Sequence, residues 1–337
     1  MAGPSNLLAL MTTGLIINPA AGGKNLKGLK LARLVAGKAD VKLAILDDFA
    51  GLSRILEEFA GAEVKTLFIS AGDGTAQAIQ TLIAEEKPFE TQPPRLALLS
   101  HGTTNMTAAE LGFQYRSLQR IADMITHPAC LRHATAIKRR ATLRIVNPRN
   151  TPPQHGMFLG AGALWRGAVA CQKLTGGTPI DGRFSAPALI LAKALVGVLF
   201  FKPTTSGGGT RIDFPCPMTI AIDKTPWVDG DQLLFLATTL NRLVLRARPF
   251  WGGERAKPGA IRATAIASPP PAIARHALSV LYGGEERGLP DGYFSMRAQH
   301  ISLEQNDPFI VDGQYFEAPH DGPLIIEQGY EFEYLCG

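Results

Sequence analysis

The stretch VKTLFISAGDGTAQAIQTLIAEE, Val64–Glu86, decides the fold class. It begins with an apolar run that suits a buried strand, places the acid Asp73 between two glycines, and continues with apolar residues at helical spacing. A strand that passes through a short glycine loop into a helix is the repeating unit of parallel α/β sheets. The stretch therefore predicts a strand–loop–helix unit with one carboxylate in its loop.

The same alternation runs through the first part of the chain. Apolar runs at 13–19, 41–46 and 95–100 predict further strands, and the segments 26–37 and 52–60 predict amphipathic helices between them. We therefore expect a doubly wound parallel sheet with helices on both faces. In such sheets, ligands bind at the carboxyl ends of the strands.

The pattern changes after His127. Strand-like runs are then separated by clusters of proline and glycine, which is typical of a mainly antiparallel sheet. The sequence thus predicts two domains, an α/β domain over residues 1–130 and a β-rich domain over residues 131–337. The total of 337 residues agrees with this division, because single domains usually have ~100–200 residues.

Composition and charge narrow the class of protein. Hydrophobic residues make up 46% of the chain and charged residues 19%, which is a globular composition. A net charge of +5 favours an anionic partner. The basic run Lys138–Arg140 is short and has no interleaved aromatic residues, so no nucleic-acid partner is expected. The cysteines form no C-x-x-C pair and the N-terminus lacks a basic signal region, so we expect a cytoplasmic protein without disulfides or zinc.

One long apolar run, residues 186–201, bears on membrane contact. It contains Lys193 and has 16 residues, whereas a membrane-spanning helix needs ~20 apolar residues. Two interpretations stay open. The run forms a buried helix, or it forms an apolar helix that lines a lipid cleft or dips into a membrane surface.

Three predicted strands end in glycine-bearing polar loops, at Asn18–Lys24, Ala71–Thr75 and Ser100–Asn105. Glycine lets backbone amides approach phosphate oxygens, and a helix that follows adds its N-terminal amides. Asp73 would repel phosphate unless a cation lay between them, so it is the candidate Mg²⁺ ligand. The candidate nucleotide-binding residues are Asn18, Pro19, Gly22, Gly23, Gly72, Asp73, Gly74, Thr75, Gly102, Thr103 and Asn105. Neither a Walker motif nor a G-x-G-x-x-G fingerprint is present.

In order and spacing, the motifs NPAAGG, AGDGT and HGTTN resemble those of the diacylglycerol kinase catalytic-domain family, which includes bacterial diacylglycerol kinases, sphingosine kinases and ceramide kinases. The later motif VDGQ, Val311–Gln314, resembles the D-G-E motif of that family. The resemblance implies a kinase that uses ATP and Mg²⁺ to phosphorylate a lipid alcohol, with a nucleotide-binding domain first and a lipid-substrate domain second. It also implies that Asp312 is the candidate general base and that Gln314 stands beside it. Peripheral contact with an anionic membrane is expected.

The chain departs from the family pattern at four positions. Ala71 replaces a glycine, and Met106, Pro258 and Gln314 stand where the family has acids. We therefore expect the structural magnesium of the family to be missing or rebuilt. Two alternatives stay open, a lipid- or nucleotide-binding protein without catalysis and an enzyme similar to NAD kinases.

Several residues allow both a structural and a functional interpretation. Asp312 with Gly313 also fits a tight hairpin turn. His101, which stands where the family usually has proline, either touches phosphate or fills a turn. Phe250 and Trp251 either face a membrane surface or belong to an ordinary surface loop.

Overall fold

The computed structural model describes residues 12–337 with gaps at 91, 114–116, 128–129, 132–135, 175–213, 252–260 and 283–287. The apolar run 186–201 and Pro258 lie outside the described residues. Within the described part of the chain, no helix is both long enough and apolar enough to cross a membrane.

The chain divides into two compact units. Unit 1 contains residues 1–140 and 332–337, and unit 2 contains residues 141–331. The functional domains that the sequence predicts, residues 1–130 and 131–337, stay a prediction. Two strands, β5 (Ala136–Ile145) and β15 (Leu324–Cys336), carry residues of both units.

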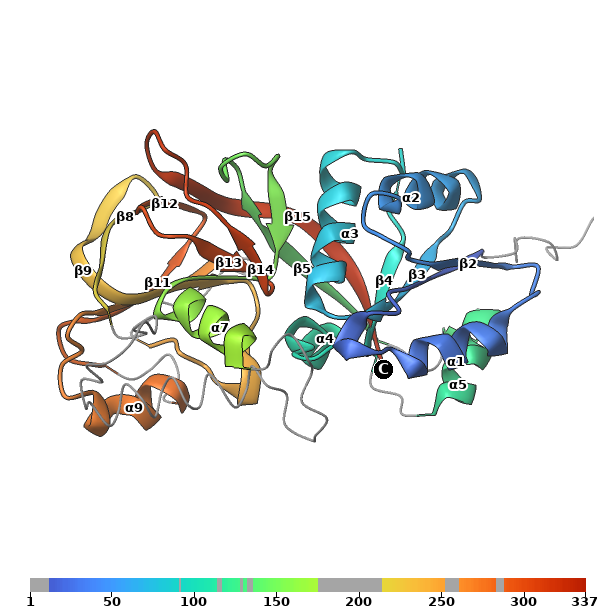
Figure 1. The fold of residues 1–337 in the computed structure, drawn as a ribbon, viewed down its shortest axis with the longest axis horizontal. Helices are drawn as coiled ribbons and strands as arrows, with labels where there is room; N and C mark the ends of the chain where they lie inside the picture. The colour runs from blue at the N-terminus through green and yellow to red at the C-terminus, as the bar shows by residue number, and fades with distance from the viewer. Residues whose placement is uncertain are drawn as a thin grey trace, which may run out of the picture. The chain divides into compact units, whose positions relative to one another are not determined.

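Unit 1 is an α/β layer structure with a parallel sheet. Its strands have the order β2-β1-β3-β4, and the end of β15 joins β4 through Tyr334 beside Leu96. Helices α1 and α5 pack on one face of this sheet, and α2 and α3 lie on the other (Figure 1). The elements are β1 (Thr13–Ile17), η1 (Ala21–Gly23), α1 (Leu26–Val35), β2 (Val41–Ile45), α2 (Leu52–Gly61), β3 (Thr66–Ala71), α3 (Asp73–Glu85), β4 (Arg95–Ser100), α4 (Met106–Leu111) and α5 (Leu118–Thr126).

The strand order of unit 1 has a direct consequence for ligand binding. The chain runs from β1 outward to β2 and then returns to the other side of β1 to form β3. The loops after β1 and β3 therefore diverge from neighbouring strands at the topological switch point, which is the usual ligand-binding place in open α/β sheets. The parallel sheet and its helices confirm the α/β fold predicted from the sequence.

Unit 2 is mainly antiparallel. Strands β13, β7, β9, β8, β12 and β15 are neighbours in that order, and β9 also pairs with β10, which pairs with β11. The confirmed β-rich region has the elements β6 (Gln154–Gly156), β7 (Phe158–Gly162), α7 (Ala163–Leu174), β8 (Cys216–Ile222), β9 (Thr225–Thr238), η3 (Val244–Arg246), β10 (Ile261–Ala267), α9 (Ile273–Tyr282), β11 (Tyr293–Ala298), β12 (His300–Glu304), β13 (Phe309–Val311) and β14 (Gln314–Phe316).

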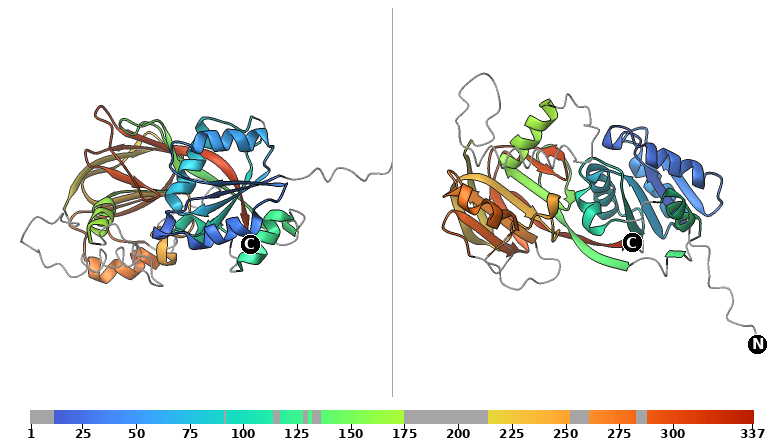
Figure 2. Two further views of the ribbon diagram at one scale, coloured as in Figure 1. Left: turned by 45° about the vertical axis from the view of Figure 1, so that its right-hand side comes forward. Right: turned by 90° about the horizontal axis from the view of Figure 1, so that it is seen from below.

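Each unit has its own apolar core. In unit 1, residues of β1, β3 and β4 pack with α1 and α5 around Phe68, which meets Phe113 edge to face. In unit 2, the inward-facing residues of the antiparallel strands pack around Phe235 and Phe309. A second cluster joins α9 to this sheet through Ile273 and Val280. Figure 2 shows α9, in orange, lying across the strands of its unit.

Candidate functional site

The three glycine loops of unit 1 meet backbone to backbone. A Cβ atom built on Gly102 would fall inside the van der Waals radius of Gly72 Cα and would lie 2.9 Å from Gly72 N. A Cβ atom on Gly22 would lie 3.1 Å from the carbonyl oxygen of His101, and Gly22 has a φ of 61° that favours glycine. The structure therefore brings the loops after β1, β3 and β4 together, as a shared phosphate site requires.

Hydrogen bonds from two asparagine side chains connect the loop after β1 with β3 and the loop that follows it. Asn18 Nδ2 donates to Thr75 Oγ1 at 2.9 Å, and Asn18 Oδ1 accepts from the backbone N–H of Ala20 at 2.9 Å. Asn25, which is 4% exposed, caps α1 by accepting from Gly28 N and donates from Nδ2 to Ser70 O. Both asparagine side chains thus hold the loops in place through both ends of their amides.

The third loop is closed on itself by Asn105. Its Oδ1 accepts from Gly102 N at 2.7 Å, its Nδ2 donates to Gly102 O at 2.6 Å, and its backbone takes the left-handed conformation with a φ of 49°. Asparagine tolerates this conformation better than most residues. Asn105 therefore shapes the loop that carries the exposed Thr103.

Helix α3 supplies the donors for an anion. Gly72 precedes it without a side-chain cap, and Asp73, Gly74 and Thr75 form its first turn. The first amides of a helix have no partner inside it, and the positive end of the helix dipole lies there. In α3 the amide of Thr75 already donates to Gly72 O at 3.2 Å. A phosphate group at this loop would meet amide donors directly.

Asp73 caps the next helix. Its Oδ2 accepts from Met106 N at 2.8 Å and its Oδ1 accepts from Thr107 N at 3.0 Å, at the start of α4. Burial raises the pKa of Asp73 above its ordinary value, while these backbone hydrogen bonds act in the opposite direction. The Asp73 carboxylate therefore connects the loop after β3 to the helix that follows the third loop, in addition to the close approach of Gly72 and Gly102.

This arrangement bears on the predicted metal. Both oxygens of Asp73 already accept amide hydrogens, and Met106 supplies a buried thioether where the family has an acid. Among the described residues there is no group of three or more His, Cys, Asp or Glu side chains that could surround a metal ion. The described residues around Asp73 therefore do not fit a magnesium ion held by the protein alone.

His101 belongs to a hydrogen-bonded chain between the loops. Asn25 Nδ2 donates to Ser70 Oγ at 3.0 Å, and Ser70 Oγ lies 2.8 Å from His101 Nδ1. The tautomer of the imidazole sets which of Ser70 Oγ and His101 Nδ1 donates in this hydrogen bond. Burial, and secondarily the charge of Lys27, lowers the pKa of His101 to about 4.

We expect this low pKa to make unfolding depend on pH. Because the folded state disfavours the protonated ring, His101 contributes stability above its unfolded pKa of 6.5, and that stability is lost as the pH falls toward about 4. After allowance for partial solvent exposure, the loss between pH 7.5 and pH 5 should be about 1–2 kcal/mol. Urea unfolding of the wild type and of His101→Gln at both pH values tests this. An equal loss in the two proteins would contradict the assignment.

Asp312 and Gln314 lie in unit 2, on the two-residue hairpin between β13 and β14. Val311 pairs with Gln314, and Asp312 and Gly313 have φ values of 47° and 86°, as a type I′ turn requires. The structural interpretation of Asp312-Gly313 as a tight turn is thus confirmed. A turn position leaves a catalytic role open.

The side chain of Asp312 is 5% exposed and is bound to backbone. Its Oδ2 accepts from Met157 N at 2.7 Å and its Oδ1 accepts from Phe158 N at 3.1 Å. Gly156 is close enough that an added Cβ atom would lie 2.9 Å from Oδ2. Gln314, in contrast, is exposed. The carboxylate of Asp312 is therefore fixed by two backbone hydrogen bonds, whereas Gln314, which stands in place of the second acid of the motif, is exposed to solvent.

The alternative that Phe250 and Trp251 face a membrane surface is wrong. They are 4% and 3% exposed, and the indole Nε1 of Trp251 donates to Tyr293 O at 3.3 Å. The guanidinium group of Arg262 lies 5.5 Å from the centre of the Phe250 ring. Both aromatic residues belong to the packing of unit 2.

Sequence reasoning missed the residues that hold the loops. Asn25 and Ser70 were not among the candidates, and neither were the amides of Met106 and Thr107 that bind Asp73. An asparagine just before an amphipathic segment is a helix-capping signal, so Asn25 was detectable. The backbone partners of Asp73 leave no trace in the sequence, since any residue offers an amide.

Residues 12–134 match the family model described as the diacylglycerol kinase catalytic domain. No curated protein matches the sequence. A crystal structure from Bacillus anthracis str. Sterne aligns with a TM-score of 0.64 and 17% identity over 96% of this chain and 97% of that one. A second from the same organism, with 17% identity and the same coverage, gives a TM-score of 0.59. Both are described in terms of diacylglycerol kinases, and at this identity they show a shared fold.

Proposed function

We propose that the protein is an ATP-dependent lipid kinase, because residues 12–134 match the family model described as the diacylglycerol kinase catalytic domain. It transfers the γ-phosphoryl group of ATP to a primary hydroxyl of a diacylglycerol-, ceramide- or sphingoid-type lipid. The observation that carries the proposal is the contact of Gly22, Gly72 and Gly102 at the switch point of the parallel sheet.

The nucleotide side of the reaction rests on backbone groups. The first-turn amides of α3 bind phosphate oxygens, while Asn18 and Asn105 fix the loops around them. Phosphoryl transfer depends mainly on positioning and on charge neutralisation, so rigid loops with converging donors are what this chemistry needs. Thr103, which is exposed on the third loop, adds a hydroxyl donor.

We propose that Mg²⁺ binds together with ATP, as part of the Mg·ATP substrate. Mg²⁺ commonly binds through one or two carboxylates together with substrate phosphates. Asp73 is the carboxylate nearest in sequence to the phosphate-binding amides, so it is the group that would meet Mg·ATP. When bound with the nucleotide, the ion supplies charge neutralisation on the transferred group.

Asp312 is the proposed general base for the lipid hydroxyl. Each oxygen of a carboxylate accepts more than one hydrogen bond, so an oxygen that accepts one amide retains capacity for a substrate hydroxyl. The amides of Met157 and Phe158 fix the direction of the carboxylate. A base of this kind acts when the attacking oxygen comes within hydrogen-bond distance.

The experiment is transfer of labelled phosphate from ATP to diacylglycerol, ceramide and sphingosine in mixed micelles, with and without Mg²⁺. We expect one lipid class to be labelled and the labelling to require Mg²⁺. The label on one class would also name the substrate.

One observation favours a second candidate, a lipid- or nucleotide-binding protein without catalysis. Both surviving acids, Asp73 and Asp312, are bound to backbone amides, and the third motif position is the neutral Gln314. ATP binding without labelling of any lipid in the panel would contradict the kinase and support this candidate.

A further inference from the structure

The positive charge of the chain is concentrated in one stretch, residues 242–282. This stretch has seven Arg and Lys residues and one Glu, a net charge of +6, while the whole chain has a net charge of +5. The other residues thus carry 27 basic and 28 acidic side chains and are close to neutral. An anionic partner that the overall charge predicts should therefore bind here.

Part of this stretch forms an exposed face of α9. Ile273 and Val280 belong to the core cluster beneath the helix, and Ala277 is buried on the same side of the helix. On the opposite side, Leu278 is 75% exposed and Tyr282 is 51% exposed, and Arg275 is exposed one turn before Leu278. Spacings of three and four residues place these side chains on one helix face. A leucine exposed to this extent on a helix is costly to leave in water.

The segment η3 continues the face of α9. Arg248 N donates to Leu281 O at 2.6 Å, which holds the segment after η3 against the end of the helix. Leu245 is 49% exposed, and Leu245 and Arg246 have φ values of 58° and 60°. Non-glycine residues take this conformation rarely and at an energetic cost, and here the turn exposes one leucine and one arginine.

Within the described part of the chain, no carboxylate pairs with Arg246, Arg248 or Arg275. The other basic run behaves differently, because Arg139 pairs with Glu333 at 2.9 Å and Arg140 with Glu110 at 2.8 Å. Among the described residues, Arg246, Arg248 and Arg275 therefore keep their charge available for an external anion, whereas Arg139 and Arg140 are paired with carboxylates.

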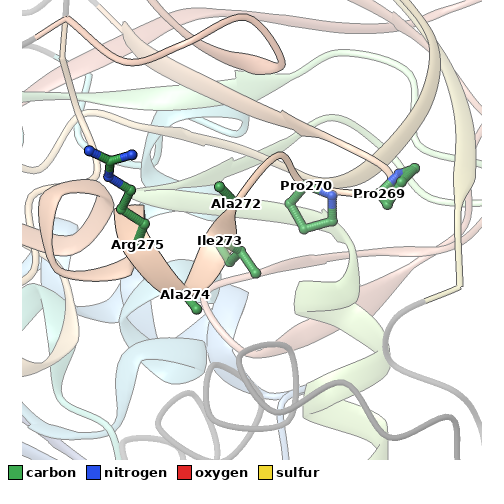
Figure 3. Close-up of a pocket in the computed structure, with 6 residues that line it drawn as sticks. All are labelled: Pro269, Pro270, Ala272, Ile273, Ala274 and Arg275. Carbon is green, nitrogen blue, oxygen red and sulfur yellow. The ribbon is translucent and has the colours of Figure 1, made fainter.

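An open apolar hollow adjoins the same face. Its volume is about 460 Å³ and it is lined by Pro269, Pro270, Ala272, Ile273, Ala274 and Arg275 (Figure 3). Figure 3 shows Arg275 on the first turns of α9, beyond the apolar side chains. Apolar surface and an arginine thus lie together at this hollow as well.

We propose that this surface, formed by Leu245, Arg246, Arg248, Arg275, Leu278 and Tyr282, docks the protein on an anionic lipid bilayer. Arginines bind the phosphate groups of the lipids while the two leucines and the tyrosine enter the interface between headgroups and acyl chains. The choice of a bilayer rests on the proposed lipid substrate, because a kinase for such a substrate must reach it in a membrane. The sequence offered Phe250 and Trp251 as residues that could face a membrane, but both are buried. Leu245, Leu278 and Tyr282 are exposed instead.

The test is sedimentation of the full chain with phosphatidylcholine vesicles, with and without phosphatidylglycerol, in the absence of ATP. We expect binding only to the anionic vesicles. The double variant Arg246→Glu/Arg248→Glu should bind roughly tenfold or more weakly, and Leu278→Ser roughly tenfold more weakly. Salt of about 1 M, where charges are screened within about 3 Å, should release most of the wild type.

Matched controls lie on α1 of unit 1, where Lys30, Arg33 and Leu34 are exposed. Lys30→Glu/Arg33→Glu changes the net charge by the same amount as the arginine pair, and Leu34→Ser removes a leucine that is 41% exposed. Both should bind like the wild type. Equal losses in controls and test variants would overturn the proposed surface, and so would tighter binding to duplex DNA than to anionic vesicles. Because no ATP is present, failure of docking is distinct from failure of phosphate transfer.

Discussion

Gly102→Ala should abolish most of the proposed kinase activity by separating two of the three glycine loops. The added methyl group has no space, since its position overlaps Gly72 Cα, and the two nearest atoms belong to the backbone of Gly72, which cannot rotate away. Overpacking of this kind costs about 1–3 kcal/mol of stability. Displacement of a positioned group by about 1 Å can cost roughly 100-fold in rate. We therefore expect ATP affinity and phosphate transfer to fall together.

Calorimetric ATP titration, urea unfolding and labelled-phosphate transfer measure these three quantities. Gly61→Ala is the matched control, because Gly61 ends α2 and nothing lies within 4 Å of its added Cβ atom. It should leave ATP binding unchanged and stabilise the fold by up to about 1 kcal/mol. Normal ATP affinity in Gly102→Ala would show that the close approach of these loops is unnecessary for nucleotide binding.

Asp312→Asn should remove turnover and leave ATP binding intact. A general base contributes roughly 100- to 10,000-fold to a rate, and an amide cannot take the proton. The substitution also places an NH₂ group against one of two amide donors, Met157 N or Phe158 N, at a buried position. An unsatisfied buried polar group costs about 1–3 kcal/mol, so stability should fall as well. ATP affinity should persist because the glycine loops lie in unit 1 and Asp312 lies in unit 2.

Asp223→Asn separates the two effects. Asp223 also has a positive φ, 49°, in a turn of unit 2, but it is exposed and a single oxygen, Oδ1, accepts from both Gln299 N and His300 N. Asparagine can keep both bonds there, so turnover and stability should stay near those of the wild type. If Asp312→Asn loses stability while its folded fraction turns over normally, the carboxylate is a turn residue and the proposed base is wrong.

The helices and strands of unit 1 could be predicted because the apolar periodicity that specifies each one lies in consecutive residues. The apolar run at 95–100 predicts a strand with the same bounds as β4, and the segment after Asp73 forms α3 as its apolar spacing indicates. The end of β15, by contrast, joins β4 through Tyr334 and was not foreseen. Its partner is more than two hundred residues away in sequence, and no local pattern specifies such a neighbour.

The roles of the candidate site residues divide in the same way. The sequence by itself determined which loops carry glycine, amide and carboxylate groups, because those properties belong to residue types and their spacing. Only the tertiary structure decided that the polar side-chain atoms of Asn18, Asn105 and Asp73 form hydrogen bonds within and between the loops themselves. Their partners are backbone amides and distant side chains, which depend on the order β2-β1-β3-β4. The tertiary structure also decided which apolar residues are exposed. Trp251 and Leu278 are both apolar, but packing buries Trp251 and leaves Leu278 in solvent.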